Sequence, residues 1–360
     1  MEELKNIIDI IEKNGFEAYF VGGFVRDNLL KINTVNIDIA TSALQKDILW
    51  MFPSAKEIKE YGAVKLQVGK YDVDITTYRK EGNFKDGKPT TLEYVSDLKT
   101  DLLRRDFTIN ALCYTKDLEL VDLINGKKDL NLKTIRVIGD TKQKFDEDPL
   151  RILRALRFMT ILDFNLDKNI LEYLKNYPEK INEIKYEKRK MELDRIFNSK
   201  HIFKFIGICR KYNLERYLGI QFKSIIRTNN SIGIWSQVVY DEKYLLSRVE
   251  KEQIKKIREI VSSKKIDKFT VYKYGNYISV IAASILKKSP KRINKMYLNL
   301  PIKDISELDI KANEICLSLS LKPSKELGEI IKELEFLVVY GKIVNKKEEL
   351  LKYLNQRKEK

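Results

Sequence analysis

The spacing of apolar and polar residues changes near residue 140. Before that point, apolar residues at helical spacing over 3–13 predict a helix, which Asn14 and Gly15 end. Residues 17–23 and 36–41 have the composition of short strands, and residues 63–78 have that of a β-hairpin turning at Gly69 and Lys70. Helices and strands therefore mix in the first part of the chain.

The segments between these elements complete a mixed α/β unit. We expect a helix over 24–30, a helix over 42–52 with Ser42 as its N-cap, a polar loop over 79–91, a helix over 97–106, and a strand pair formed by 110–115 and 118–123. From Pro149 onward the apolar spacing is mostly helical. The pattern predicts an α/β head over 1–140, a helical neck over 141–200, and a helical body and tail over 201–360.

Several residue types limit the chemistry. His201 is the only histidine, which argues against a Ser-His-Asp triad or a histidine metal cluster, so a metal would need oxygen ligands, as Mg²⁺ or Mn²⁺ do. The three cysteines are scattered, which predicts neither disulfides nor a zinc site and favours a reducing, cytoplasmic location. We expect no membrane span, because no run of 18 apolar residues occurs, and the N-terminal segment is an acidic amphipathic helix rather than a signal peptide.

Charge is unevenly distributed. Residues 1–150 carry 23 Lys and Arg against 26 Asp and Glu, a net of −3, whereas residues 151–360 carry 45 against 26, a net of +19. A basic second part indicates a polyanionic partner. A lysine-rich proteome from an AT-rich genome would give a similar composition, so charge alone does not decide.

Two stretches of the head carry candidate chemistry. Gly22 and Gly23 join a strand to a helix, so backbone N–H groups can approach a phosphate, and Arg26 lies one turn into that helix. In the strand 36–41, Asn36 and Asp38 point to the same side. Asp74, on a later strand, could complete a metal cluster, and Asp72 shares the face of Asp74.

Four motifs, in order, resemble those of class II tRNA nucleotidyltransferases, the bacterial CCA-adding enzymes and poly(A) polymerases of the polymerase-β-like superfamily. They are "VGGFVRD", "IDIATSA", "RRDFTINAL" and "FDEDPLRILRALRF". The resemblance continues to the C-terminal segment and covers nearly the whole chain. It implies an α+β fold, in which a polymerase-β-like head with a mixed sheet is followed by an all-helical neck, body and tail.

The resemblance also implies roles for named residues. Asp38 and Asp74 would be catalytic, with Asp38 and Asn36 at a Mg²⁺ site. Gly22, Gly23 and Arg26 would contact the triphosphate, Arg105 would bind the nucleotide, and Asp106 and Asn110 are candidates for sugar contacts. Asp148, Arg151, Arg154 and Arg157 fall at helical i, i+3, i+6 and i+9 positions and would converge on the nucleotide.

In the family, the residues corresponding to Asp148 and Arg151 read the base in place of a nucleic-acid template. Cytosine and adenine both present an exocyclic amine beside a ring-nitrogen acceptor, which match a carboxylate and a guanidinium. Uracil and guanine present a carbonyl where the amine would be, which leaves buried polar groups unpaired. The implied reaction adds CMP and AMP from CTP and ATP to the 3′ end of tRNA. The loop at 79–91 would help the switch from C to A addition, the basic helical part would hold the acceptor arm of tRNA, and no protein partner is implied.

Position 36 departs from the family pattern. The family has Asp-x-Asp where this chain has Asn36, Ile37 and Asp38, and Val35 replaces a usual glycine. An amide supplies an oxygen but no charge, so we expect turnover at least about a hundredfold slower than with aspartate. Lys188 also stands where an arginine is typical. Two alternatives stay open: a poly(A) polymerase of the same superfamily, and a non-catalytic tRNA- or RNA-binding paralogue.

Overall fold

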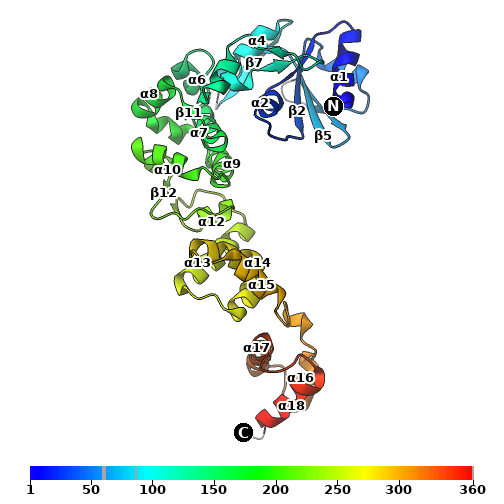
Figure 1. The fold of residues 1–360 in the computed structure, drawn as a ribbon, viewed down its shortest axis with the longest axis vertical. Coiled ribbons are helices and arrows are strands. Elements are labelled where there is room, and N and C mark those ends of the chain that lie inside the picture. Colours follow the sequence, from blue (N-terminus) through cyan, green and yellow to red (C-terminus); the bar gives the residue numbers. More distant parts are fainter. Residues whose placement is uncertain (59–61, 86, 359–360) are drawn as a thin grey trace. The chain divides into compact units, whose positions relative to one another are not determined.

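The computed structural model describes residues 1–58, 62–85 and 87–358. The chain forms two compact units, Met1–Gly219 and Ile220–Lys360, coloured blue to green and green to red in Figure 1. No helix within the described ranges is long and apolar enough to cross a membrane. The predicted boundaries at 140 and 200 stay predictions.

A seven-stranded mixed sheet forms the centre of the head. Its strand order is β3-β4-β5-β2-β1-β8-β9, with β2 and β5 parallel and the other neighbours antiparallel. The strands are β1 Ala18–Val21, β2 Asn36–Thr41, β3 Lys56–Ile58, β4 Ala63–Val68, β5 Tyr71–Thr77, β8 Cys113–Tyr114 and β9 Leu120–Val121. The predicted strand at 36–41, the hairpin turning at Gly69, and the late strand pair all form.

Short helices surround this sheet. They are α1 Glu2–Lys13, α2 Gly23–Leu29, α3 Gln45–Met51, α4 Leu98–Leu103, the 3-10 turn η1 Thr108–Asn110, and α5 Gly126–Asn131. The prediction that Ser42 caps α3 is wrong, because the helix begins later, after Leu44, whose N–H donates to Asp47 Oδ2 at 3.3 Å. The Ser42 hydroxyl instead accepts a hydrogen bond from the Glu17 N–H at 2.9 Å.

The stretch predicted as a loop over 79–91 is a β-hairpin. Strands β6 Arg79–Lys85 and β7 Lys88–Tyr94 pair antiparallel as a separate two-stranded sheet. Position 86 of the predicted loop lies outside the described residues. Much of the hairpin surface is exposed, so its sequence lacks the alternation of apolar residues that reveals a half-buried strand.

The rest of unit 1 is mainly helical. It contains β10 Thr134–Ile135, α6 Thr141–Glu147, α7 Leu150–Leu162, β11 Asn165–Leu166, α8 Lys168–Asn176, η2 Pro178–Glu183, α9 Tyr186–Phe197, α10 Ile202–Lys211 and α11 Glu215–Leu218. Most side chains of α7 are buried, and α7 packs against α9. The short parallel pair of β10 and β11 is an addition to the predicted helices.

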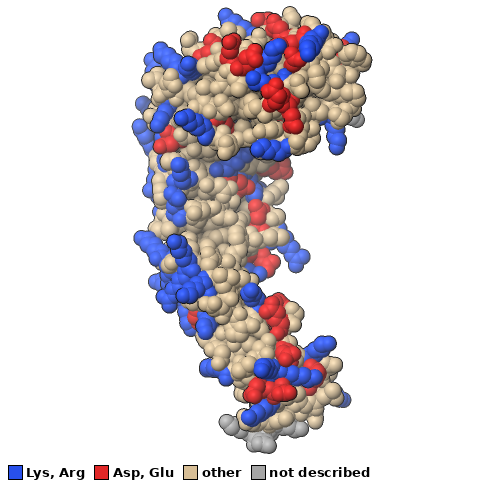
Figure 2. All heavy atoms as spheres, turned by 45° about the vertical axis from the view of Figure 1, so that its right-hand side comes forward, with Lys and Arg blue, Asp and Glu red and all other residues tan. Residues whose placement is uncertain are grey.

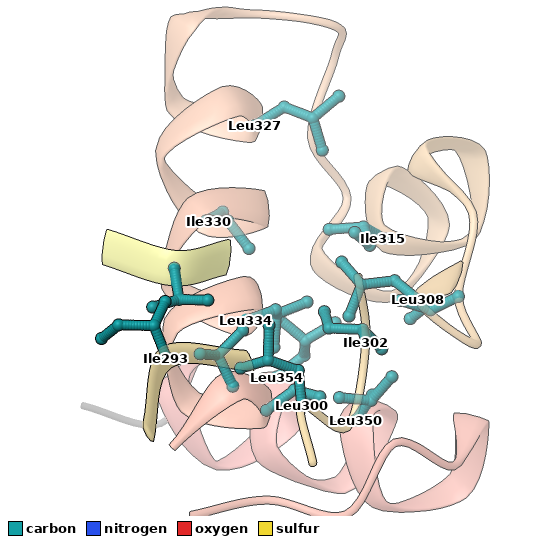
Figure 3. Close-up of a cluster of buried hydrophobic side chains, with 14 of the residues drawn as sticks. Ile293, Leu300, Ile302, Leu308, Ile315, Leu327, Ile330, Leu334, Leu350 and Leu354 are labelled. Carbon is teal, nitrogen blue, oxygen red and sulfur yellow. The ribbon is translucent and has the colours of Figure 1, made fainter. Parts of the chain in front are cut away.

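Unit 2 is also mainly helical. It contains β12 Ile220–Gln221, α12 Ser231–Trp235, β13 Val239–Tyr240, α13 Arg248–Ser263, α14 Lys268–Ile285, α15 Pro290–Leu298, η3 Ile305–Glu307, α16 Ala312–Leu319, α17 Lys325–Val339 and α18 Lys347–Lys358. Gly275, at φ +76°, kinks α14. Ile293, Leu334 and Leu354, from α15, α17 and α18, belong to one buried apolar cluster (Figure 3).

The basic residues of unit 2 are concentrated over α13 to α15. Residues 243–295 carry 15 Lys and Arg against 4 Asp and Glu, a net of +11. On the face drawn in Figure 2, blue side chains outnumber red ones over this part of the unit. This segment therefore provides a positively charged surface.

Candidate active site

A cavity of about 500 Å³ opens in the head and the following helices of unit 1. All ten residues predicted to bind the nucleotide line it, together with Asp38: Gly22, Gly23, Arg26, Arg105, Asp106, Asn110, Asp148, Arg151, Arg154 and Arg157. They come from segments separated by more than 100 positions in the sequence. The fold therefore brings the predicted nucleotide residues into one pocket.

Gly22 lies against the carboxylate of Asp38. A β-carbon at Gly22 would be 3.0 Å from Asp38 Oδ2, and the residue has a φ of +70°. The positive φ strongly favours glycine here, and a β-carbon would also crowd the Asp38 carboxylate. The next N–H, that of Gly23, donates a hydrogen bond to Asp38. Gly22 and Gly23 therefore form the turn and also hold the Asp38 carboxylate in place.

Arg26 is held in place from two sides. Its Nε donates to Asp27 Oδ1 at 2.8 Å, and its Nη1 donates to the side-chain oxygen of Asn110. The guanidinium also lies 4.9 Å from the ring centroid of Phe158. Because Arg26 is buried and already oriented, it needs little reorganisation to meet a phosphate.

Asp101 and Glu81 orient a group of arginines at the cavity wall. Asp101, fully buried in α4, accepts from Arg104 at 2.8 Å and from Arg105 at 3.1 Å. Glu81 of β6 accepts from Arg79 at 2.8 Å and from Arg104 at 2.9 Å. Burial raises the pKa of Asp101, but the charges of Arg105 and Arg104 outweigh it and leave this pKa below its ordinary value.

Asp106 is fully engaged by protein groups. It accepts from Arg154 Nε at 2.8 Å and from Arg154 Nη2, from Asn110 Nδ2 at 3.0 Å, and from the Phe107 N–H at 2.8 Å. Burial raises its pKa, but Arg154 and the hydrogen bonds from Asn110 and Phe107 bring it below the ordinary value. Its predicted sugar contact stays a prediction.

Asp148 lies before α7, not on it. It follows α6 with extended backbone angles, φ −145° and ψ 94°, and α7 begins at Leu150. The predicted helical row therefore applies to Arg151, Arg154 and Arg157 but is wrong for Asp148. Pro149 explains the difference, because a residue before proline is driven out of the helical region.

The arginines on α7 have separate partners. Arg151 Nη1 donates to the Lys144 carbonyl at 2.9 Å, and Arg157 Nε donates to Glu192 Oε2 at 2.5 Å. Burial raises the pKa of Asp148 above its ordinary value, while Arg151 and the Leu150 N–H favour its ionised form. Arg151 and Asp148 both line the cavity, and Arg151 forms its ion pair with Glu147 at 3.4 Å.

The β6–β7 hairpin reaches this pair. The Arg151 guanidinium lies 5.6 Å from the centroid of the Phe84 ring, and Gly87 lies against Asp148. A segment remote in sequence thus contacts both residues predicted to read the base.

Asp38 and Asp74 are register partners on the neighbouring parallel strands β2 and β5, so they project from the same side of the sheet. Burial raises the pKa of Asp38, as does the charge of Asp74, against the opposing effects of Arg105, the Gly23 N–H and Arg26. Asp74 Oδ1 is buried and has no hydrogen-bond partner. Asp74 and Asn36 do not line the cavity, and Asn36 is exposed.

The chain and its fold are similar to those of known proteins. The profile of the Poly A polymerase head domain matches residues 18–136, and that of tRNA nucleotidyltransferase domain 2 matches residues 242–354. The CCA-adding enzyme of Staphylococcus haemolyticus (strain JCSC1435) is 32% identical, over 98% of this chain and 97% of that protein. This chain belongs to the CCA-adding enzyme family. The family resemblance read from the four motifs is therefore confirmed.

Other relatives agree with this membership. The CCA-adding enzyme of Bacillus mycoides (strain KBAB4) is 28% identical, over 99% of each chain. The crystal structure of the Bacillus stearothermophilus CCA-adding enzyme in complex with CTP superposes with a TM-score of 0.85 at 22% identity, over 99% of this chain and 97% of that one. The Thermotoga maritima enzyme complexed with tRNA gives 0.68 at 20% identity, over 98% and 94%. The predicted α+β fold with a polymerase-type head is confirmed.

Family members are nucleotidyltransferases that generally use a divalent metal. The acidic strands of this chain fit such an ion, because Asp74 Oδ1 is a buried carboxylate oxygen with no hydrogen-bond donor and its register partner, Asp38, is a second carboxylate. A divalent ion between the two carboxylates would reduce their repulsion. No three acidic, histidine or cysteine side chains of the described residues are gathered into a ready metal site.

Some residues of the cavity were not found from the sequence. Glu81, Arg104, Leu150 and Phe158 line it, and Asp101 and Glu192 support its arginines from behind. Of these residues, only Asp101 could have been found from the sequence, because it precedes Arg104 and Arg105 by one helical turn. Glu81 and Glu192 come from distant segments, and no local pattern marks them.

Proposed function

We propose that this protein adds CMP and AMP to the 3′ end of tRNA, using CTP and ATP, without a nucleic-acid template. The observation that carries the proposal is the single cavity that contains all ten predicted nucleotide residues and Asp38. Relatives solved with CTP, ATP and tRNA support the same substrates.

Base reading follows from two side chains. Asp148 accepts from the exocyclic amine of cytosine or adenine, and Arg151 donates to the ring nitrogen beside it. Because both bases share this edge, one pair of residues selects both, and uracil or guanine would place a carbonyl against the carboxylate. The hairpin contacts with Asp148 and Arg151 support a part for residues 79–91 in the change from C to A addition.

The remaining cavity residues hold the nucleotide for transfer. Arg26 and Arg105 bind the triphosphate next to the Gly22–Gly23 turn, and Asp106 and Asn110 lie near the sugar. The 3′-hydroxyl of tRNA loses its proton to solvent, and its oxygen forms a bond to the α-phosphorus. The bond from the α-phosphorus to the oxygen that bridges to the β-phosphorus breaks, and pyrophosphate leaves. Asp38 and Asp74 would hold Mg²⁺, which when bound neutralises phosphate charge and polarises the reacting groups.

The basic residues of α13 to α15 supply the tRNA-binding surface in this proposal. Phosphate contacts by Lys and Arg give shape-based binding of an RNA helix that falls with salt concentration. The tRNA substrate and the scattered cysteines are consistent with a cytoplasmic location.

The test is incorporation of labelled nucleotides into tRNA that lacks its CCA end, with each of the four nucleoside triphosphates and Mg²⁺. We expect C, C and A, with little U or G. An Arg151→Lys variant keeps the charge but loses the two-pronged donor, so selectivity should fall. Arg210→Lys changes an exposed residue outside the cavity and should behave like the unaltered protein.

Two results would replace the proposal. A homopolymeric A tail on unrelated RNA would identify a poly(A) polymerase. Binding of tRNA with no incorporation, in this chain and in its Asn36→Asp variant, would identify a binding paralogue.

A further inference from the structure

The register of two strands places an aspartate directly opposite Asn36. Strands β2 and β5 run parallel, with Asn36 paired to Asp72 and Asp38 paired to Asp74. Alternate residues of a strand share a face, and register partners share it too. Asn36, Asp38, Asp72 and Asp74 therefore project from the same side of the sheet as a block of one amide and three carboxylates.

Positive charge compensates this block only in part. The charges of Arg105 and Arg26 act on Asp38, but neither Asp72 nor Asp74 forms an ion pair among the described residues, and Asp74 Oδ1 has no hydrogen-bond donor. The next strand, β4, places Lys65 opposite Asp74 and Gln67 opposite Asp72, but both side chains are exposed. A bound cation would reduce the remaining repulsion between the three carboxylates.

We propose that Asp72 supplies the carboxylate that position 36 lacks and serves as a metal-binding residue of the transfer site. The inference rests on the proposed nucleotidyltransferase function. Neighbouring strands lie about 4.8 Å apart, so carboxylates on register partners reach much of the same space. A hard divalent cation accepts oxygen ligands from either strand, because it responds to ligand charge and number rather than to chain position.

The position of Asp72 in the fold also favours a role in metal binding. Asp72 is half-buried, whereas Asn36 is exposed, and the Asp72 N–H donates to the Val35 carbonyl at 3.0 Å, which fixes its backbone beside the acidic strand. No three such ligands of the described residues are gathered in advance. The proposal therefore requires Asp72 to turn its side chain to reach the ion. That turn changes only side-chain torsions.

If Asp72 binds the metal, the effect of Asn36→Asp on turnover depends on whether Asp72 is present. With Asp72 in place, Asn36→Asp should raise turnover by much less than the hundredfold that position 36 alone implies. With Asp72 replaced by asparagine, Asn36→Asp should raise turnover strongly. The two positions should therefore be non-additive, as expected for residues that share one function.

The experiment measures Mn²⁺ binding by the EPR signal of the free ion, with no nucleotide or tRNA present. Asp72→Asn should weaken binding at least about tenfold. The exchanged variant, Asn36→Asp with Asp72→Asn, keeps the number of carboxylates and should restore binding. Asp117→Asn, an exposed aspartate remote from this face, is the matched control and should leave binding unchanged. Melting temperatures confirm that each variant is folded.

Unchanged Mn²⁺ binding in folded Asp72→Asn would overturn the inference, and so would weakened binding that the exchanged variant does not restore. Nucleotide incorporation by the same variants separates this result from the broader proposal. If no variant, including Asn36→Asp, extends tRNA, the proposed function fails while the Mn²⁺ series still decides the part of Asp72.

Discussion

Gly87 and Asp148 lie in contact, although they are 61 positions apart in the sequence. A β-carbon on Gly87 would be 2.7 Å from Asp148 Oδ1, and Gly87 has a φ of +71°. The β6–β7 hairpin therefore meets the carboxylate predicted to read the base. A substitution at Gly87 should therefore displace the hairpin or Asp148 and affect the selection of the base.

Gly87→Ala should lower kcat/KM for CTP and ATP at least about tenfold, because the added methyl group displaces either the hairpin or Asp148. Its backbone strain should cost only about 1 kcal/mol of folding free energy. Gly139→Ala is the control, since Gly139 has a φ of +80° and nothing within 4 Å of an added β-carbon. Equal kinetic effects of the two variants would contradict the prediction.

Glu192→Gln should destabilise the protein by about 3 kcal/mol, because it leaves the buried Arg157 guanidinium without its charged partner. Urea unfolding measures the loss. Glu187→Gln changes an exposed residue of the same helix and should have little effect. A stable Glu192→Gln protein would mean that Arg157 finds another partner.

Arg189→Lys should cost about 2 kcal/mol or more of stability. The buried guanidinium donates to three backbone carbonyls, those of Ile184 at 2.7 Å, Tyr217 at 2.9 Å and Asn182 at 2.9 Å, which one ammonium group cannot replace. Lys188→Arg is the matched change and should be nearly neutral, since Lys188 is exposed. Thermal unfolding measures the loss of stability, and similar melting temperatures for Arg189→Lys and Lys188→Arg would contradict the prediction.

Asp38→Asn should stabilise the metal-free protein at pH 7 and reduce turnover at least about a hundredfold. Because burial raises the pKa of Asp38, the folded state favours the protonated carboxyl. That contribution is complete below the ordinary pKa of 3.8 and is lost as pH rises through the raised value. The stabilisation should therefore shrink toward pH 4, as thermal unfolding in EDTA would show. A constant difference across this range would contradict it.

The sequence predicted those elements that have a buried face. Strand β2 carries Ile37 and Ile39 inward at alternate positions, and its predicted bounds agree with the structure. The β6–β7 hairpin has mostly exposed residues, so a polar loop was predicted where strands form. Alternation of apolar residues indicates a buried face. An exposed strand pair that is held by backbone hydrogen bonds shows little of this alternation.

The cavity residues could be predicted because short motifs surround them, but their partners could not. Arg157 and Glu192 are 35 positions apart, and nothing local in either segment indicates the pair. Asp148 was placed on a helix because its spacing to Arg151 is three residues, and Pro149 moves it off. The opposition of Asn36 and Asp72 required the strand register, which the sequence alone leaves open.

The side chains that line the cavity have a consequence for ion balance. Six arginines stand against four acidic residues, a surplus of two positive charges. A nucleoside triphosphate carries about four negative charges at neutral pH, and one divalent ion bound to it leaves about two. Asp101 and Glu192, which pair with Arg104, Arg105 and Arg157 from behind, offset this surplus. The pocket therefore cannot neutralise a bare triphosphate beside Asp38, so nucleotide uptake and metal uptake are expected to be coupled.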